Sequence, residues 1–280
     1  MNLKFVCTHW GQEYLNPRGF IEKITDAGYN GIEIFLPSDA DFCNAFMAEM
    51  EDTYEKNSDF IFIPQQLINP INETVVEFIK RMENELLKLV SYQPTYINSH
   101  TGKDYYSFDD NCRIIEACLN ISAITGVRIL QETHRGRFSF HAATLLPYLD
   151  KFPELELVGD FSHFCVVSES LLQDQKYIID KIIPHVSHIH ARVGFDQGPQ
   201  VNDPFAPEWE NHLIWFKGWW QQIIENKKQN GWNNFNITPE FGPEPYMPAL
   251  PFTKQPIGNQ WEINKAMMQY LKTNLNNSTN

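Results

Sequence analysis

Short apolar runs alternate along the chain with longer segments in which apolar residues recur every three or four positions. The runs predict β-strands and the periodic segments predict α-helices, because side chains repeat about every 2 residues in a strand and about every 3.6 in a helix. We expect strands at residues 3–9, 31–36, 60–64, 95–100, 127–132, 155–160, 186–192 and 235–240. Helices are expected at residues 20–27, 75–90, 112–125, 142–152, 177–183, 209–227 and 260–275. This order is typical of parallel strands joined by helical crossovers.

Eight strand–helix units fit a closed (β/α)₈ TIM barrel. The length of 280 residues suits one barrel, so we expect a single TIM-barrel domain over residues 1–280. A doubly wound open sheet with extra strands is the alternative, although no G-x-G-x-x-G motif follows the first expected strand. Two long connections, 194–208 and 242–258, follow expected strands and should therefore lie over the barrel mouth, where the active sites of TIM barrels are built.

Composition narrows the classes of partner. The formal net charge is -13, with 22 basic and 35 acidic residues and no basic run, which argues against nucleic acid as a partner. No apolar stretch approaches the roughly 18 residues of a membrane span, so we expect no membrane insertion. Five cysteines without C-x-x-C spacing, and a start without an apolar signal-peptide core, favour a cytoplasmic protein. A homo-oligomer is compatible with these features.

Four successive expected strands each have, at or near their carboxyl end, a residue of a type that binds metal ions. These residues are Glu132, Asp160, His190 and Glu240. In a parallel barrel the carboxyl ends of all strands meet at one face, so the four side chains can converge. A single acid at a strand end more often caps a helix or pairs with arginine, but four in succession favour a metal site. Three carboxylates and one imidazole suit one divalent ion, with Mn²⁺ favoured and Mg²⁺, Co²⁺ or Zn²⁺ as alternatives.

Other polar residues near the strand ends are candidates for binding substrate: His100, His134, His163 and Arg192. A structural, hydrogen-bonded histidine is an equally good interpretation of His100 and His163, and a solvated loop explains His134 as well. Glu33 lies within an apolar strand, which favours a structural or outer-shell carboxylate. Aromatic residues expected near the mouth could stack on the apolar face of a sugar, and these are Trp10, Phe161, Phe164, Phe195 and Trp209.

The chain resembles the xylose isomerase-like TIM barrel superfamily, the sugar phosphate isomerase/epimerase group that also includes the endonuclease IV nucleases. The resemblance covers nearly the whole chain, and its motifs are Gly31-Ile-Glu-Ile, Glu132, Asp160-x-x-His163, His190 and Pro239-Glu240. It implies that the four metal-ligand candidates hold one Mn²⁺ or related ion. It also implies that Glu132 and Glu240 are catalytic and move protons.

Two departures from the family pattern restrict what the resemblance implies. The ketose epimerases carry a further glutamate about six residues after the first metal glutamate, where this chain has Phe138. The nucleases need three zinc ions, but this chain has Pro64-Gln-Gln and Phe195-Asp-Gln-Gly where their additional ligands lie. The remaining ligands suffice for one ion, which argues against a DNA-repair nuclease.

The resemblance favours a metal-dependent isomerase or epimerase that acts on a ketose or hydroxycarbonyl sugar-like small molecule through a metal-stabilised enediolate. A lyase or dehydratase of the type that cleaves 3-keto-glycosides by β-elimination is the alternative. A non-catalytic sugar-binding barrel is the third hypothesis. Glu240→Gln distinguishes them, because a binder would keep its affinity whereas either enzyme would lose proton exchange at the substrate carbon. One barrel hosts many reactions, so the substrate stays open.

Overall fold

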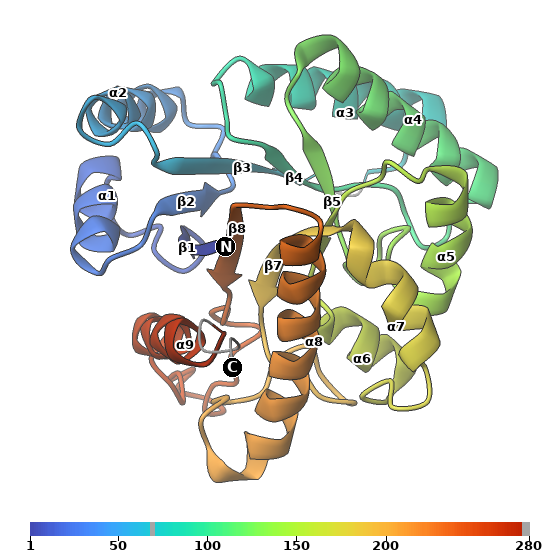
Figure 1. Ribbon diagram of the computed structural model, residues 1–280. Helices are drawn as coiled ribbons and strands as arrows, with labels where there is room; N and C mark the ends of the chain where they lie inside the picture. The colour runs from blue at the N-terminus through green and yellow to red at the C-terminus, as the bar shows by residue number, and fades with distance from the viewer. Residues whose placement is uncertain (68–70, 276–280) are drawn as a thin grey trace.

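The computed structural model describes residues 1–67 and 71–275, and these form a closed barrel of eight parallel strands. The strands follow one another around the barrel in chain order, and β1 pairs with both β2 and β8 to close it. They are β1 (Asn2–Thr8), β2 (Gly31–Ile34), β3 (Ile61–Leu67), β4 (Ile97–His100), β5 (Ile129–Glu132), β6 (Leu157–Gly159), β7 (Val186–Ala191) and β8 (Asn234–Pro239). Figure 1 shows the strands at the centre and the helices around them. The prediction of a (β/α)₈ TIM barrel is confirmed.

The helical ring contains two α-helices beyond those expected from the sequence, α2 and α6. Helix α2 buries only Cys43, Phe46 and Met50 among its seventeen residues, so its apolar stripe is weak. Helix α6 has only seven residues, too few to show a period. The helices are α1 (Pro17–Asp26), α2 (Ala40–Lys56), α3 (Val75–Val90), α4 (Phe108–Thr125), α5 (Ala142–Lys151), α6 (Ser162–Ser168), α7 (Lys176–Ile182), α8 (Glu210–Gln229) and α9 (Gln260–Leu275), with 3₁₀ turns η1 (Ile183–His185) and η2 (Pro207–Trp209).

Side-chain caps fix where the first four helices begin. Asn16, Asp39, Thr74 and Ser107 each accept a hydrogen bond from a backbone N–H in the first turn of the helix that follows. Such a cap satisfies a donor that has no partner within the helix, and it is worth about 1 kcal/mol. The loops that leave the carboxyl ends of the strands therefore end at defined residues.

A separate apolar cluster lies next to the polar groups at the strand ends. It consists of Val6, Ile61, Ile63, Tyr96, Leu130 and Val158, all of which are buried. The Tyr96 hydroxyl hydrogen-bonds His188 Nδ1 at 2.5 Å, which joins this cluster to the polar groups of β7. The candidate site therefore rests on packed side chains.

The interface between the barrel and α8 provides a test of core packing. Trp220 is 2% exposed and contacts Phe216, whereas Trp215 on the same helix is 39% exposed. We expect Trp220→Ala to lower the free energy of unfolding by about 3–5 kcal/mol, because it removes a large buried ring and leaves a cavity. Urea denaturation measures this loss. Trp215→Ala is the matched control and should lower the free energy of unfolding clearly less than Trp220→Ala does. Equal losses of unfolding free energy in the two variants would contradict this description of the interface.

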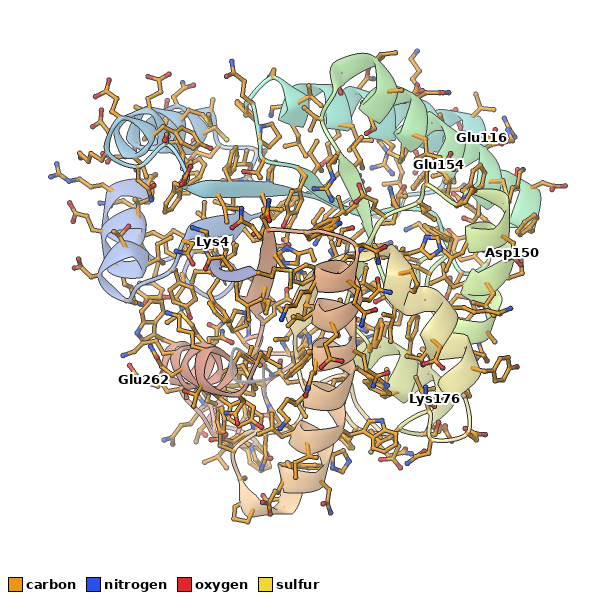
Figure 2. The ribbon with its side chains drawn as sticks, in the orientation of Figure 1. Lys4, Glu116, Asp150, Glu154, Lys176 and Glu262 are labelled. Carbon is orange, nitrogen blue, oxygen red and sulfur yellow. The ribbon has the colours of Figure 1, made fainter. Side chains whose placement is uncertain are left out.

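The outer surface of the ring carries charged side chains. Figure 2 shows Glu116, Asp150 and Lys176 on outer helices, pointing away from the barrel. None of the helices in the described parts of the chain combines the length and the apolar character needed to cross a bilayer.

Candidate metal centre

Four side chains from successive strands converge at the carboxyl end of the barrel. Glu132 ends β5, Asp160 follows β6, His190 lies near the end of β7, and Glu240 follows β8. His190 Nδ1 is 2.8 Å from Glu240 Oε2 and 3.6 Å from Glu132 Oε2. Asp160, His190 and Glu240 each offer a ligand atom within 4.8 Å of the other two. The structure thus brings together the four residues that the sequence suggests as metal ligands.

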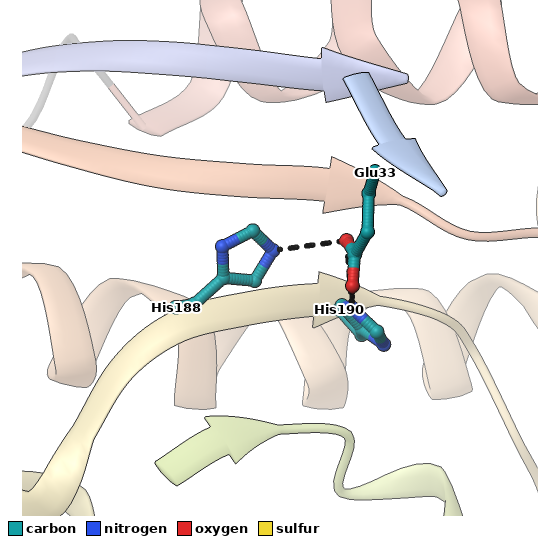
Figure 3. Close-up of side chains that lie close together, drawn as sticks. All are labelled: Glu33, His188 and His190. Atoms are coloured by element: carbon teal, nitrogen blue, oxygen red, sulfur yellow. Dashed lines mark hydrogen bonds and ion pairs between the residues drawn. The ribbon is translucent and has the colours of Figure 1, made fainter. Parts of the chain in front are cut away.

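Glu33 holds the opposite nitrogen of the His190 ring. Figure 3 shows the Glu33 carboxylate between His188 and His190, and His190 Nε2 lies 2.9 Å from Glu33 Oε1. Asn98, Gln65 and Thr238 also donate hydrogen bonds to this fully buried carboxylate. Burial alone would raise the pKa of Glu33, but His190, His188 and Thr238 lower it to about 2. An ionised Glu33 keeps the proton on Nε2 and directs Nδ1 toward the carboxylates, as in many metal-binding histidines.

The electrostatics of this group fit a divalent cation. Burial raises the pKa of Asp160 to about 6; Arg192 opposes that rise, and the carboxylates of Glu240 and Glu132 add to it. Burial would lower the pKa of His190, but Glu240, Glu33 and Glu132 raise it well above its usual value. Within the described residues, the fully buried His190 Nδ1 has no partner in hydrogen-bond geometry. A cation among these oxygens would relieve the carboxylate repulsion and bind Nδ1 in place of a proton.

Arg192 bridges two of the ligand carboxylates. Its Nε donates to Asp160 Oδ2 at 3.0 Å, and its Nη2 donates to Glu240 Oε2 at 2.5 Å. Burial opposes the charged form of Arg192, but Glu240 and Asp160 raise its pKa above the usual value. The residue therefore fixes the orientation of these acids, and its guanidinium also lines the cavity described below.

The three histidines predicted to bind substrate lie together beside Glu132 and Asp160. His100 Nε2 is 2.6 Å from Glu132 Oε2, and His163 Nε2 is 3.5 Å from Asp160 Oδ2. The His134 ring centroid is 5.0 Å from that of His100 and 3.9 Å from that of His163. Burial and the nearby charge of His100 lower the pKa of His134 to about 3, and burial with His134 lowers the pKa of His163 well below its usual value. His134 and His163 are therefore neutral near neutral pH.

A cavity of about 460 Å³ opens at these strand ends, and its walls include Glu132, Glu240, Arg192, His100 and His134. Asp160, His163 and His190 are fully buried and do not line it. A volume of this size is typical of a small-molecule site. Both proposed proton-transfer glutamates, Glu132 and Glu240, are therefore accessible to a bound molecule.

The aromatic walls differ from the sequence-based expectation. Five aromatic residues were expected near the mouth. Of these five, Trp10 alone is among the described residues that line the cavity. Phe161 and Phe164 are buried in the core, where they stack on each other. Tyr246, Phe35 and Phe42 line the cavity instead, from the loops after β8 and β2 and from α2. Sequence spacing gives no direction for a loop side chain, so these aromatics were not identifiable in advance.

Residues from both long connections meet at the mouth. Gln200 Oε1 accepts a hydrogen bond from the Gly242 backbone N–H at 2.6 Å, and Gln200 Nε2 donates to the Gly242 carbonyl at 3.1 Å. A Cβ at Gly242 would lie 2.3 Å from the Trp10 ring, so only glycine lets the indole pack against this backbone. The two loops and Trp10 therefore form one connected rim. Phe138, at the epimerase glutamate position, packs instead against Tyr148 in the core.

Comparisons with known proteins identify the fold. No protein-family model and no curated protein sequence matches this chain. Among solved structures, the probable 3-DHS dehydratase of Bacillus anthracis has a TM-score of 0.63 at 16% identity, over 97% of this chain and 99% of that one. The 3-keto-D-glucoside 4-epimerase of E. coli has a TM-score of 0.58 at 15% identity, over 97% and 100%. A xylose isomerase-like TIM barrel protein from Mycobacterium smegmatis, in complex with magnesium, has a TM-score of 0.60 at 12% identity, over 97% of each chain. The chain thus has the fold of the xylose isomerase-like TIM barrels.

Glu33→Gln tests the support of His190. We expect the variant to lose about 3 kcal/mol of unfolding free energy near pH 7, because a neutral amide leaves several buried donors without an acceptor. The pKa of Glu33 is lowered on folding from 4.5 to about 2, so the carboxylate stabilises the protein above pH 4.5. That stabilisation is lost as the pH falls from 4.5 toward 2. The difference between wild type and variant should therefore shrink over this range.

Denaturant titrations at several pH values measure this difference. Glu154→Gln is the matched control, since Glu154 is exposed on the surface and the same change there should have little effect. A difference between wild type and Glu33→Gln that stays constant from about pH 7 to about pH 3 contradicts an ionised Glu33.

Proposed function

We propose that the protein is a divalent-metal-dependent isomerase or epimerase of a ketose or related hydroxycarbonyl compound. The observation that carries this proposal is the convergence of Glu132, Asp160, His190 and Glu240 beside a cavity that both glutamates line. The partner we propose is accordingly a small sugar-like molecule.

Glu132, Asp160, His190 and Glu240 would hold the metal ion, for which we propose Mn²⁺. The three carboxylates and one imidazole form a hard donor set, and the magnesium in the Mycobacterium smegmatis protein supports an ion of this kind. When bound, the ion would supply Lewis-acid polarisation of a carbonyl and a neighbouring hydroxyl, which lowers the cost of removing the proton from the carbon that carries this hydroxyl.

We propose that Glu132 and Glu240 move that proton. Burial would raise the pKa of Glu132, but His100 and His190 hold it well below its usual value, so its carboxylate is ionised and can accept a proton. Glu240 faces the same His190 nitrogen as Glu132 and would return a proton to the neighbouring carbon or to the opposite face. Arg192 holds Glu240 in position through its 2.5 Å hydrogen bond.

His100, His134 and Arg192 would orient the substrate oxygens, because their side chains reach the cavity wall. His163 supports this group from behind through its contact with the His134 ring. The ring of Trp10 at the cavity wall would stack on the apolar face of a sugar and exclude water.

A lyase or dehydratase is the second candidate, and one observation favours it. His100 Nε2 lies 2.6 Å from Glu132 Oε2, and both residues line the cavity. His100 could therefore pass the proton that Glu132 removes from carbon to a departing hydroxyl group, which leaves as water. The likeness to the Bacillus anthracis dehydratase is compatible with this reaction.

Incubation with a ketose panel in D₂O, with Mn²⁺ present, separates these functions. An isomerase or epimerase gives metal-dependent deuterium uptake at a carbon next to the carbonyl, together with a rearranged sugar. Loss of water or of a sugar from the labelled compound supports the lyase. Ligand binding without deuterium uptake in the wild-type protein would support a non-catalytic barrel and refute both enzyme proposals.

A further inference from the structure

Most buried basic side chains in the described part of the chain have an evident partner. Arg192 is paired with Asp160 and Glu240. Lys227 donates to the Pro184 carbonyl. Pairing of this kind is required because an isolated buried charge is costly.

Arg137 is half-buried and has no such partner among the described residues. It follows β5 in the loop that also holds His134, and its side chain lines the cavity shared with Glu132 and Glu240. Among the described residues, no carboxylate lies within 4.0 Å of its guanidinium, and its buried Nε has no hydrogen-bond partner. Burial lowers the pKa of Arg137; Glu132 and Asp104 act on it only at longer range and in the opposite direction. The charge of Arg137 is thus available to the cavity.

Lys103 adds a second cation nearby. It lies in the loop after β4, is 6% exposed, and has no ion pair with any described residue; its Nζ is 5.9 Å from the centre of the Phe78 ring. Burial lowers the pKa of Lys103, and the charge of Arg137 lowers it further. The like charges of Arg137 and Lys103 repel each other, and an anion bound at Arg137 would relieve this repulsion.

We propose that Arg137 forms a subsite for an anionic group, a carboxylate or a phosphate, on the substrate. Lys103, which does not line the cavity, adds positive charge at longer range. The guanidinium fork matches the oxygen pair of either group, and the ammonium adds charge without a fixed direction. Glu132 lies beyond ion-pair distance of Arg137 but acts on its charge, so an anionic group at Arg137 would share the cavity with this glutamate. This proposal rests on the proposed function and narrows its substrate class to charged hydroxycarbonyl compounds.

Three ligands that differ only at one carbon test the subsite: D-fructose, D-fructose 6-phosphate and D-fructuronate. Calorimetry measures their binding to the wild-type protein with Mn²⁺ present, and inorganic phosphate serves as an additional probe. We expect one charged ligand to bind more tightly than fructose, and the preferred one identifies the phosphate or the carboxylate as the recognised group. In Arg137→Gln the ratio of charged to neutral affinity should fall about 10- to 100-fold, the usual effect of losing a hydrogen bond to a charged group.

The controls separate this role from a structural one. Arg113→Gln makes the same change at an exposed arginine on α4 and should leave the ratio as in the wild type. Thermal unfolding of Arg137→Gln should be close to that of the wild type, because this half-buried guanidinium forms no ion pair with a described residue; a large downward shift would indicate a structural arginine. Lys103→Met should lower the ratio in the same direction as Arg137→Gln.

Calorimetry also distinguishes this proposal from the proposed reaction. If no ketose takes up deuterium but the charged ligands bind through Arg137, the reaction is wrong and the subsite stands. If deuterium is taken up but wild type and Arg137→Gln have the same ratio, the subsite is wrong and the reaction stands. Absence of any preference for a charged ligand in the wild-type protein, with no binding of inorganic phosphate, also overturns the subsite.

Discussion

Replacing Glu240 by glutamine is expected to lower the rate of deuterium exchange at the substrate carbon by about 10²- to 10⁴-fold, the usual contribution of a positioned acid or base. The amide keeps the shape of the side chain but cannot take up or return a proton. Glu132→Gln should have an effect of the same order, since the two carboxylates face His190 Nδ1 from two strands. NMR of the exchanging carbon in D₂O measures both rates.

Glu244→Gln is the matched control, because Glu244 lies on the same loop, is exposed, and should exchange at the wild-type rate. Metal content is measured on each variant, so that loss of the ion is not mistaken for loss of the base. A Glu240→Gln protein that retains metal and exchanges within about 3-fold of the wild type would exclude Glu240 as a proton-transfer group.

Removal of the metal should abolish exchange and destabilise the fold. Dialysis against a chelator is expected to lower the unfolding free energy by about 3 kcal/mol, the stabilisation that a ligand supplies at about 100 times its dissociation constant. The physical reason is that burial, together with repulsion from Glu240 and Glu132, disfavours the Asp160 carboxylate and raises its pKa to about 6. Metal analysis and thermal unfolding, before and after restoration of Mn²⁺, measure the effect.

His190→Ala should lose the ion, because it removes the nitrogen ligand of the set. His185→Ala provides the control, since His185 precedes β7 at the opposite end of that strand and bonds the Leu155 carbonyl. If His190→Ala keeps one divalent ion per chain with unchanged affinity, the proposed four-residue site is wrong.

The position of the candidate ligands was predictable because it depends on strand ends. Glu132, Asp160, His190 and Glu240 each close an apolar run, and closure of a parallel barrel brings such ends to one face. The role of Glu33 was partly predictable, since an acid inside an apolar strand requires partners. The four donors that it has come from other strands, and only the closed barrel selects them.

Loop residues were less predictable than strand residues. The bonds from Arg192 to both Asp160 and Glu240 depend on side-chain directions that sequence spacing does not contain. The basic loop after Glu132 is compatible with a solvated tip, but Arg137 and His134 line the cavity. Helix α2 had a detectable signal in the Asp39 cap and in Cys43, Phe46 and Met50 at three- and four-residue spacing.

The pairing of β1 with β8 has a consequence for synthesis on the ribosome. Phe5 on β1 lies opposite Ile237 on β8. One edge of β1 therefore stays unpaired during synthesis until β8 has been made. Until then the nascent barrel is an open sheet with two unpaired edges, which can pair with another chain. We therefore expect that pairing of β8 with β1, and not the folding of any one earlier strand–helix unit, limits the yield of native protein, and that chaperones which shield strand edges raise this yield.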